Sequence, residues 1–223
     1  MNPAQPANAL PRRSLEISAL RCRRGERVLF ESLDLSVPPG ELLLLRGPNG
    51  VGKTTLLLAL AGILSPEAGT IAILGRSDED RPGADLHLLG HQPATKPRLT
   101  VAENLRFWAD MLGGERDLVE PALEAVGLAA IAGLEAGHLS AGQTRRLGLA
   151  RLLVADRPIW LLDEPTAALD ADGERLVLGL LAAHLARGGL AVAATHHDMQ
   201  LPPPANVRTL TLSRPSALPG GTP

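Results

Sequence analysis

The most constraining feature of this sequence is an apolar run followed at once by a glycine-rich segment. The run is Leu42–Arg46, and the segment reads Gly47-Pro48-Asn49-Gly50-Val51-Gly52-Lys53-Thr54. An unbroken apolar run predicts a strand buried on both faces. The glycines let backbone N–H groups converge on phosphate oxygens, and a helix from Lys53 to about Leu64 directs its positive end to the same place. Lys53 supplies a cation and Thr54 a hydroxyl for Mg²⁺, so an α/β nucleotide-binding fold is predicted.

The rest of the chain alternates between strand and helix patterns, which predicts a largely parallel sheet with ligands at the carboxyl ends of its strands. Further strands are predicted at Leu15–Arg21, Arg27–Phe30, Leu33–Val37, Thr70–Leu74, Ile159–Asp163 and Leu190–Thr195, and helices at Val101–Leu112, Leu118–Val126, Gly142–Ala155 and Ala171–Arg187. We expect a disordered lead over 1–13, one domain over 14–213 with a helical insert at about 94–155, and a disordered tail over 214–223.

Composition narrows the classes of function. The net charge is −2 and aromatic residues make up 2% of the chain, so neither a basic field nor a base-stacking platform favours nucleic acid as a partner. The single cysteine, Cys22, excludes an internal disulfide and is interpreted as a small core residue on a strand. No secretory signal or membrane span is recognisable, so a cytoplasmic protein is expected.

A second motif is the pair of acids, Asp163 and Glu164, that ends the apolar strand Ile159–Asp163. A carboxylate at the tip of a strand beside a phosphate loop can hold Mg²⁺. The following Glu164 can accept a proton from the water that attacks the γ-phosphate. The alternative is an exposed acidic turn before Pro165.

A third motif, Leu139-Ser140-Ala141-Gly142-Gln143, precedes a predicted helix and lies between the other two motifs. A hydroxyl at a helix N-terminus can form an anion site, whereas the alternative is that Ser140 merely caps the helix. This helix cannot easily face its own phosphate loop across an intervening strand and helix. A second subunit is therefore the expected recipient of its dipole.

Together these motifs resemble the nucleotide-binding domain of ABC transporters, over about residues 14–200. Gln92, the Ala168-Leu169-Asp170 turn and His196 complete the family's set. The resemblance implies an ATPase of the ABC-type P-loop fold, with a mixed sheet core, an N-terminal antiparallel β subdomain and a helical insert. It also implies that two copies enclose two ATP molecules with Mg²⁺.

The resemblance assigns roles residue by residue. Glu164, His196 and Gln92 would be catalytic, with His197 as the competitor of His196, and Asp170 would cross the dimer interface. Thr54, Gln92 and Asp163 would bind Mg²⁺. The nucleotide in the same chain would contact Gly47, Pro48, Asn49, Gly50, Val51, Gly52, Lys53, Thr54, Thr55 and Arg24. The nucleotide of the second copy would contact Leu139, Ser140, Ala141, Gly142 and Gln143.

Two positions depart from the usual family pattern. Arg24, or Arg23 if the register slips, stands where an aromatic residue often stacks on adenine. A guanidinium plane can also stack on a base, and the alternative is a surface arginine in a basic turn. Ala141 stands where glycine is commoner, and its methyl group is tolerable if Ser140 and Gly142 make the phosphate contacts.

A narrower resemblance is to the ATPase subunit of the bacterial cytochrome c maturation system, often called the haem exporter ATPase. It rests on the segments Leu89–Pro93, Leu99–Phe107, Cys22–Phe30 and Thr144–Leu147. It implies membrane-spanning partner subunits and a peripheral position on the cytoplasmic side of the inner membrane. No haem-ligand set is visible, since Cys22 lacks the Cys-x-x-Cys-His pattern of covalent attachment.

Other readings stay open. The chain could serve another ABC transporter, act as a soluble ATPase on DNA or ribosomes, or bind nucleotide without hydrolysing it. The interval between Lys53 and Ser140 is too short for the long coiled coil of chromosome-type ATPases. The presence of Glu164 and His196 argues against a module that does not hydrolyse ATP.

Overall fold

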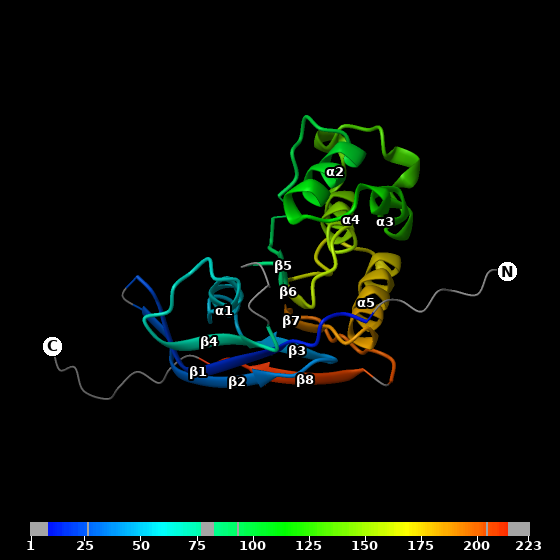
Figure 1. The fold of residues 1–223 in the computed structure, drawn as a ribbon. Helices are drawn as coiled ribbons and strands as arrows, with labels where there is room; N and C mark the ends of the chain where they lie inside the picture. The colour runs from blue at the N-terminus through cyan, green and yellow to red at the C-terminus, as the bar shows by residue number, and fades with distance from the viewer. Residues whose placement is uncertain (1–8, 26, 77–82, 93, 204, 214–223) are drawn as a thin grey trace.

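The computed structural model describes residues 9–25, 27–76, 83–92, 94–203 and 205–213. In this part of the chain a parallel sheet and a smaller antiparallel sheet form the base of the molecule (Figure 1). A group of helices stands above one end of the parallel sheet, in green to yellow (Figure 1). The predicted α/β fold with strands of both orientations, an N-terminal antiparallel subdomain and a helical insert is confirmed. Among the described residues the antiparallel pairs lie in the smaller sheet, and the core sheet is parallel.

The parallel sheet has the strand order β5-β6-β7-β3-β8. Its strands are β3 (Glu41–Arg46), β5 (Leu86–Leu89), β6 (Ile159–Asp163), β7 (Leu190–Ala194) and β8 (Asn206–Thr211). Every residue of β6 and β7 is buried, as expected for apolar strands with helices on both faces. The sequence patterns had not indicated β5 or β8.

Two helices cover opposite faces of this sheet, α1 (Lys53–Leu60) and α5 (Ala171–Ala186). Alternation along β3 divides its side chains between them. Leu42 belongs to the apolar cluster that includes α5, and Leu43 belongs to the cluster that includes α1. The phosphate loop therefore leaves a strand that is fixed from both sides.

The antiparallel sheet has the order β2-β1-β4, with β1 (Ser14–Arg24), β2 (Arg27–Val37) and β4 (Ala68–Leu74). The expectation of two strands within 27–37 was wrong, because β2 is continuous. The pairing of β1 with β2 shifts register between Ile17 and Leu20, where Ala19 adopts φ 48°. This irregularity in β1 lets β2 run on without a break. Cys22 is buried on β1, as predicted.

The helical insert contains α2 (Val101–Leu112), α3 (Val119–Ala125) and α4 (Ala141–Ala150), joined by short 3-10 turns at Arg116–Leu118, Ala129–Ile131 and Ala136–His138. Thr100 and Glu103 form a capping box at the start of α2, and Gly113 ends it in the left-handed conformation. Helix α4 ends at Ala150, five residues earlier than predicted, and continues as turns.

The expectation of a disordered lead does not hold for residues 10–13, which pack against the domain. Leu10 is only 5% exposed and donates its backbone N–H to the Arg187 carbonyl over 2.9 Å. Arg13 forms a buried ion pair with Asp85 at 2.7 Å. These contacts tie residues 10–13 to the domain, which composition alone could not reveal. The expectations for 1–8 and for the tail at 214–223 lie outside the described residues.

Among the described residues, none of the helices combines the length and the apolarity that crossing a bilayer requires.

Candidate functional site

The phosphate loop joins β3 to α1 and uses glycine where no other residue fits. Gly47 has φ 137°, and a Cβ there would lie 2.4 Å from the Leu212 carbonyl oxygen. Gly52 has φ 118°, and a Cβ there would meet the Phe30 ring at 2.8 Å. Gly52 also begins α1 without any side-chain cap. The first N–H groups of α1 therefore have no capping side chain and can serve an anion.

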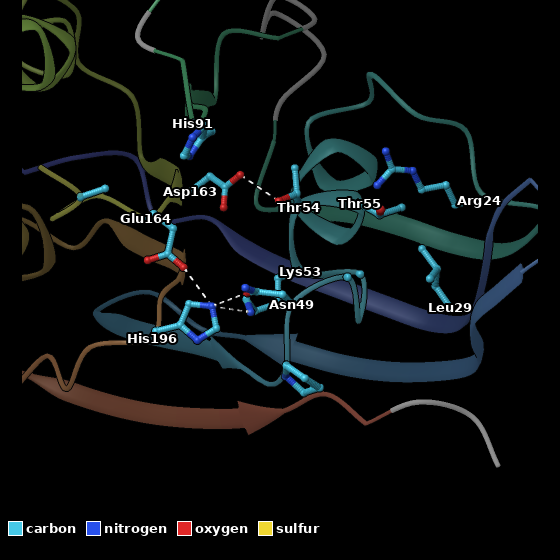
Figure 2. Close-up of a pocket in the computed structure, with 14 residues that line it drawn as sticks. Arg24, Leu29, Asn49, Lys53, Thr54, Thr55, His91, Asp163, Glu164 and His196 are labelled. Carbon is cyan, nitrogen blue, oxygen red and sulfur yellow. Dashed lines mark hydrogen bonds and ion pairs between the residues drawn. The ribbon is translucent and has the colours of Figure 1, made fainter. Parts of the chain in front are cut away.

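A cavity of about 480 Å³ opens above this loop, within the usual range for small-molecule sites. It collects residues from the loop and α1, from the end of β1 and the start of β2, from the end of β6 and the turn after it, and from the segments after β5 and β7 (Figure 2). Its lining comprises Arg24, Leu29, Pro48, Asn49, Gly50, Gly52, Lys53, Thr54, Thr55, His91, Asp163, Glu164, Ala167 and His196.

Lys53 and His196 meet at one side of the cavity. The Lys53 ammonium donates to the Gly47 carbonyl over 2.7 Å and lies 3.2 Å from His196 Nε2. The same ring nitrogen lies 2.9 Å from Asn49 Oδ1. Nε2 donates to Asn49 when protonated and accepts from Lys53 when it is not, so the tautomer decides which bond exists. His196, rather than His197, lines the cavity.

Asp163 and Thr54 bring two hard oxygen ligands together at the base of the cavity. The Thr54 hydroxyl donates to Asp163 Oδ2 over 2.9 Å, and Asp163 is only 5% exposed (Figure 2). A hydroxyl and a carboxylate beside a phosphate-binding loop are the ligand types that suit Mg²⁺. These residues therefore fit the predicted metal site.

Glu164 directs its carboxylate into the cavity from an unusual backbone conformation. Its φ is 47°, in the left-handed region. Its backbone N–H donates to the Ala194 carbonyl on β7 over 2.8 Å, and its Oε1 lies 3.6 Å from His196 Nε2. Non-glycine residues in this region are held there by their surroundings and gather at functional sites. The predicted alternative of a free acidic turn does not describe this geometry.

Arg24 lies at the opposite end of the cavity from Glu164, with Thr55 and Leu29 nearby (Figure 2). Arg23, the other candidate for this position, forms an ion pair with Glu67 at 3.7 Å instead. The placement of Arg24 is compatible with stacking on a base, which stays a prediction.

Gln92 is not brought to the cavity. It is exposed on a bend after β5, whereas the neighbouring His91 lines the cavity. Two residues earlier the chain is held in place, since Arg145 donates to the Gly90 carbonyl over 2.9 Å. The predicted contact of Gln92 with Mg²⁺ stays a prediction.

The segment 139–143 begins α4 and lies outside the cavity. Ser140 and Gln143 form a complete capping box, with Ser140 Oγ accepting from the Gln143 backbone N–H at 3.2 Å. The helix cap, which is the alternative role for Ser140, is therefore present, and Ser140 is exposed. Gly142 lies against the Ala168 carbonyl, where a Cβ would come within 3.0 Å. Asp170 caps α5 and lies 3.4 Å from Arg146.

Sequence patterns gave no role to Arg145, which is buried behind the two acids. Its guanidinium donates to the carbonyls of Gly90, Asp163, Glu164 and Pro165. Burial lowers the pKa of this guanidinium, and the negative charges of Asp163 and Glu164 oppose the shift. Its partners are distant in sequence, so only the fold could identify it.

Comparisons with known proteins agree with the geometry. A protein-family model described as "ABC transporter" matches residues 30–167. A "Cytochrome c biogenesis ATP-binding export protein CcmA" of Rhodopseudomonas palustris (strain BisB5) is 54% identical over 180 residues, covering 81% of this chain and 90% of that protein. The protein of the same description from Rhizobium meliloti (strain 1021) is 52% identical over 191 residues, covering 83% and 92%.

Solved structures give the same result for the fold. A putative ABC transporter ATP-binding protein from Pyrococcus furiosus superposes with a TM-score of 0.75 at 26% identity, covering 89% of this chain and 97% of that one. Both the matched segment and the curated relatives extend across most of the domain that carries the cavity. The chain therefore belongs to the ABC transporter family, among its cytochrome c biogenesis ATP-binding proteins.

Proposed function

We propose that this chain is the ATP-hydrolysing subunit of an ABC-type membrane complex for cytochrome c maturation, which exports haem or releases haem-loaded chaperone. The observation that supports hydrolysis is the Glu164 carboxylate, which faces the same cavity as Lys53 and Asp163. An acceptor for a proton, a cation for phosphate and a metal-binding acid are the groups that phosphoryl transfer to water requires.

The proposed chemistry is an attack of water on the γ-phosphorus of ATP. Glu164 orients the water and accepts its proton, the bond from phosphorus to the β,γ-bridging oxygen breaks, and ADP leaves with that oxygen. Lys53 and the N–H groups of the loop balance the phosphate charge. Thr54 and Asp163 would hold Mg²⁺, which neutralises part of that charge. His196 holds Glu164 and the water, and Gln92 would bind Mg²⁺ and the attacking water.

The proposed active unit contains two copies of the chain. Ser140 and the N-terminus of α4 are exposed and contribute nothing to the cavity of their own chain. A helix N-terminus with a serine hydroxyl suits a phosphate, so the ATP of a second copy is its proposed ligand. Asp170, exposed at the start of α5, would lie at the same interface.

The proposed partners are membrane-spanning subunits that contact the insert from the cytoplasmic side of the inner membrane. In the described part of the chain, three of the five exposed large hydrophobic side chains lie in the insert, namely Met111, Leu118 and Leu134. Exposed apolar groups mark surfaces that partners cover. The link to cytochrome c rests on the relatives' names and on the segment Leu89–Phe107.

A complementation experiment tests the proposal. In a bacterium that lacks its own copy of this ATPase, the wild-type chain is expected to restore covalently haem-bearing c-type cytochromes, and Lys53→Ala is not. Tagged chain purified from membranes should carry membrane-spanning subunits. If the strain forms normal c-type cytochromes without the chain, a role in another ABC transporter is favoured. If the chain purifies without membrane-spanning subunits, a soluble ATPase is favoured.

A further inference from the structure

Arg145 joins the ends of two strands of the parallel sheet. It is 3% exposed, and its planar group donates to the Gly90 carbonyl after β5, to the carbonyl of Asp163 at the end of β6 and to those of Glu164 and Pro165 just beyond it. A guanidinium can make this set of bonds because it presents five N–H donors in a rigid fork. Arg145 thus fixes the turn from which Glu164 enters the cavity.

The Glu164 backbone depends on such support. Its φ of 47° is a conformation that persists only where the surroundings hold it. The residue is held on both sides: its N–H donates to the Ala194 carbonyl, and its carbonyl accepts from Arg145 and from the Ala167 N–H at 3.0 Å. Without the hydrogen bond from Arg145 to the Glu164 carbonyl, the Glu164 carboxylate is free to turn away from the cavity.

Arg145 also belongs to the helix that Ser140 begins. Helix α4 carries Ser140 at its exposed start and Arg145 in its buried second turn. The exposed end is the proposed contact for the ATP of the second copy, and the buried residue contacts the turn of Glu164 at the chain's own ATP site. If contact with the ATP of the second copy shifts α4, Arg145 shifts with it. Because Arg145 is bonded to the turn that carries Glu164, the shift reaches the ATP site of the chain itself.

We infer that Arg145 is a positioning residue that sets the orientation of Glu164 according to the seating of α4, and so links the two ATP sites of the dimer. This inference rests on the proposed function, since it needs Glu164 to act on ATP. It goes beyond that function by assigning the communication between sites to one buried guanidinium.

The test compares Arg145→Lys with Arg151→Lys in the complete chain. Arg151 is the matched control because it is a buried arginine at the end of the same helix, where it donates to the Leu88 carbonyl and lies 4.0 Å over the Trp108 ring. Lysine keeps the charge at both positions but loses the fork. Arg145→Lys should lower kcat about 10- to 100-fold, as for a misplaced catalytic group, with KM for ATP unchanged within about twofold. Arg151→Lys should keep kcat within about threefold of the wild type.

A structural readout separates this inference from the proposed function. Amide hydrogen exchange at Glu164 and Ala167 should be faster in Arg145→Lys than in Arg151→Lys, whether or not the chain hydrolyses ATP. Equal exchange in both variants, or an equal loss of kcat in both, overturns the role of Arg145. Equal ATP turnover by the wild type and Glu164→Gln overturns the proposed function instead. If Arg145→Lys does not fold, Arg145→Gln, which keeps two donors, takes its place.

The link between sites has its own measurement. Because Ser140 and Arg145 are proposed to act along one helix, the kcat loss of Ser140→Ala combined with Arg145→Lys should be smaller than the product of the two single losses. A combined loss equal to that product overturns the link.

Discussion

Glu164 Oε1 lies 3.6 Å from His196 Nε2, although the two residues follow different strands, β6 and β7. These strands are neighbours in the parallel sheet, so their carboxyl ends bring an acid and an imidazole to one edge of the cavity. His196 in turn lies within 3.2 Å of the Lys53 ammonium. The proposed proton acceptor, Glu164, and the proposed phosphate-binding cation, Lys53, therefore share His196 as a neighbour.

Replacing Glu164 by Gln should separate binding from turnover. The amide keeps the size of the side chain but cannot accept the proton of the attacking water, so turnover should fall by at least about 100-fold while ATP still binds. The bound ATP should trap a dimer, which size-exclusion chromatography with Mg²⁺ and ATP measures. Glu31→Gln, at an exposed position on β2, is the control and should behave as the wild type. Near-normal turnover in Glu164→Gln would contradict the role of Glu164.

Replacing Ser140 by Ala should impair ATP-driven dimerisation more than ATP binding to the monomer. The change also removes a helix cap, which costs about 1 kcal/mol. Thr100→Ala is a matched control because it removes the same kind of capping box from α2. Both variants should lose similar stability, whereas only Ser140→Ala should weaken the dimer. Similar dimer formation by the two variants would leave Ser140 as a local cap.

Replacing Arg24 by Ala should raise the KM for ATP several-fold, about 3- to 10-fold for a lost cation–π contact of about 1 kcal/mol. Arg23→Ala controls for the loss of one positive charge, since Arg23 pairs with Glu67 rather than lining the cavity. Steady-state kinetics with ATP measure both. An unchanged KM in Arg24→Ala would make Arg24 an ordinary surface arginine.

Two buried histidines should make the folded state sensitive to acid. Burial lowers the pKa of His87 to about 3 and that of His184, stacked on Trp160, to about 4. In the unfolded chain a histidine has a pKa near 6.5, so below that pH the unfolded state binds more protons than the folded state. The contribution of these histidines to stability is therefore complete above about pH 6.5 and is lost as the pH decreases toward 4. Within this range, each histidine should lower the free energy of unfolding by up to about 1.4 kcal/mol for each unit by which the pH falls.

Urea unfolding at pH 7, 6 and 5 checks this dependence. His184→Gln should unfold more easily at pH 7 but show a smaller loss of stability on acidification than the wild type. His138→Gln, at an exposed position, should leave the slope unchanged. A wild-type stability that does not change between pH 7 and 5 would contradict the prediction.

Features encoded by adjacent residues were predictable from the sequence. The phosphate loop lies within eight consecutive positions and Asp163 directly precedes Glu164, so local pattern and chemistry sufficed. The four-residue strand β5 was too short to show periodicity. In the edge strand β8, Asn206–Thr211, the only apolar residues, Val207 and Leu210, lie three positions apart and so do not alternate with polar ones. Neither gave a strong strand pattern.

Contacts between distant segments could not be predicted. The ion pair of Arg13 with Asp85 spans 72 positions, and the bond from Arg145 to Gly90 spans 55. No pattern along the chain records which buried carbonyls an arginine will reach. Gln92 shows the opposite difficulty, because a family motif names its role while the position of its side chain depends on the conformation of the segment after β5.

At Glu164 the left-handed backbone makes a long side chain conformationally costly, although the length of that side chain carries the carboxylate into the cavity. Aspartate and asparagine adopt such φ values more readily than glutamate. Glu164→Asp should therefore relax the turn and raise the melting temperature, while its carboxylate is withdrawn by one methylene from the cavity and catalysis slows. Glutamate is thus a conformationally costly residue at this position, and the reason we propose is its length, because a shorter side chain would fall short of the water that Glu164 is proposed to orient.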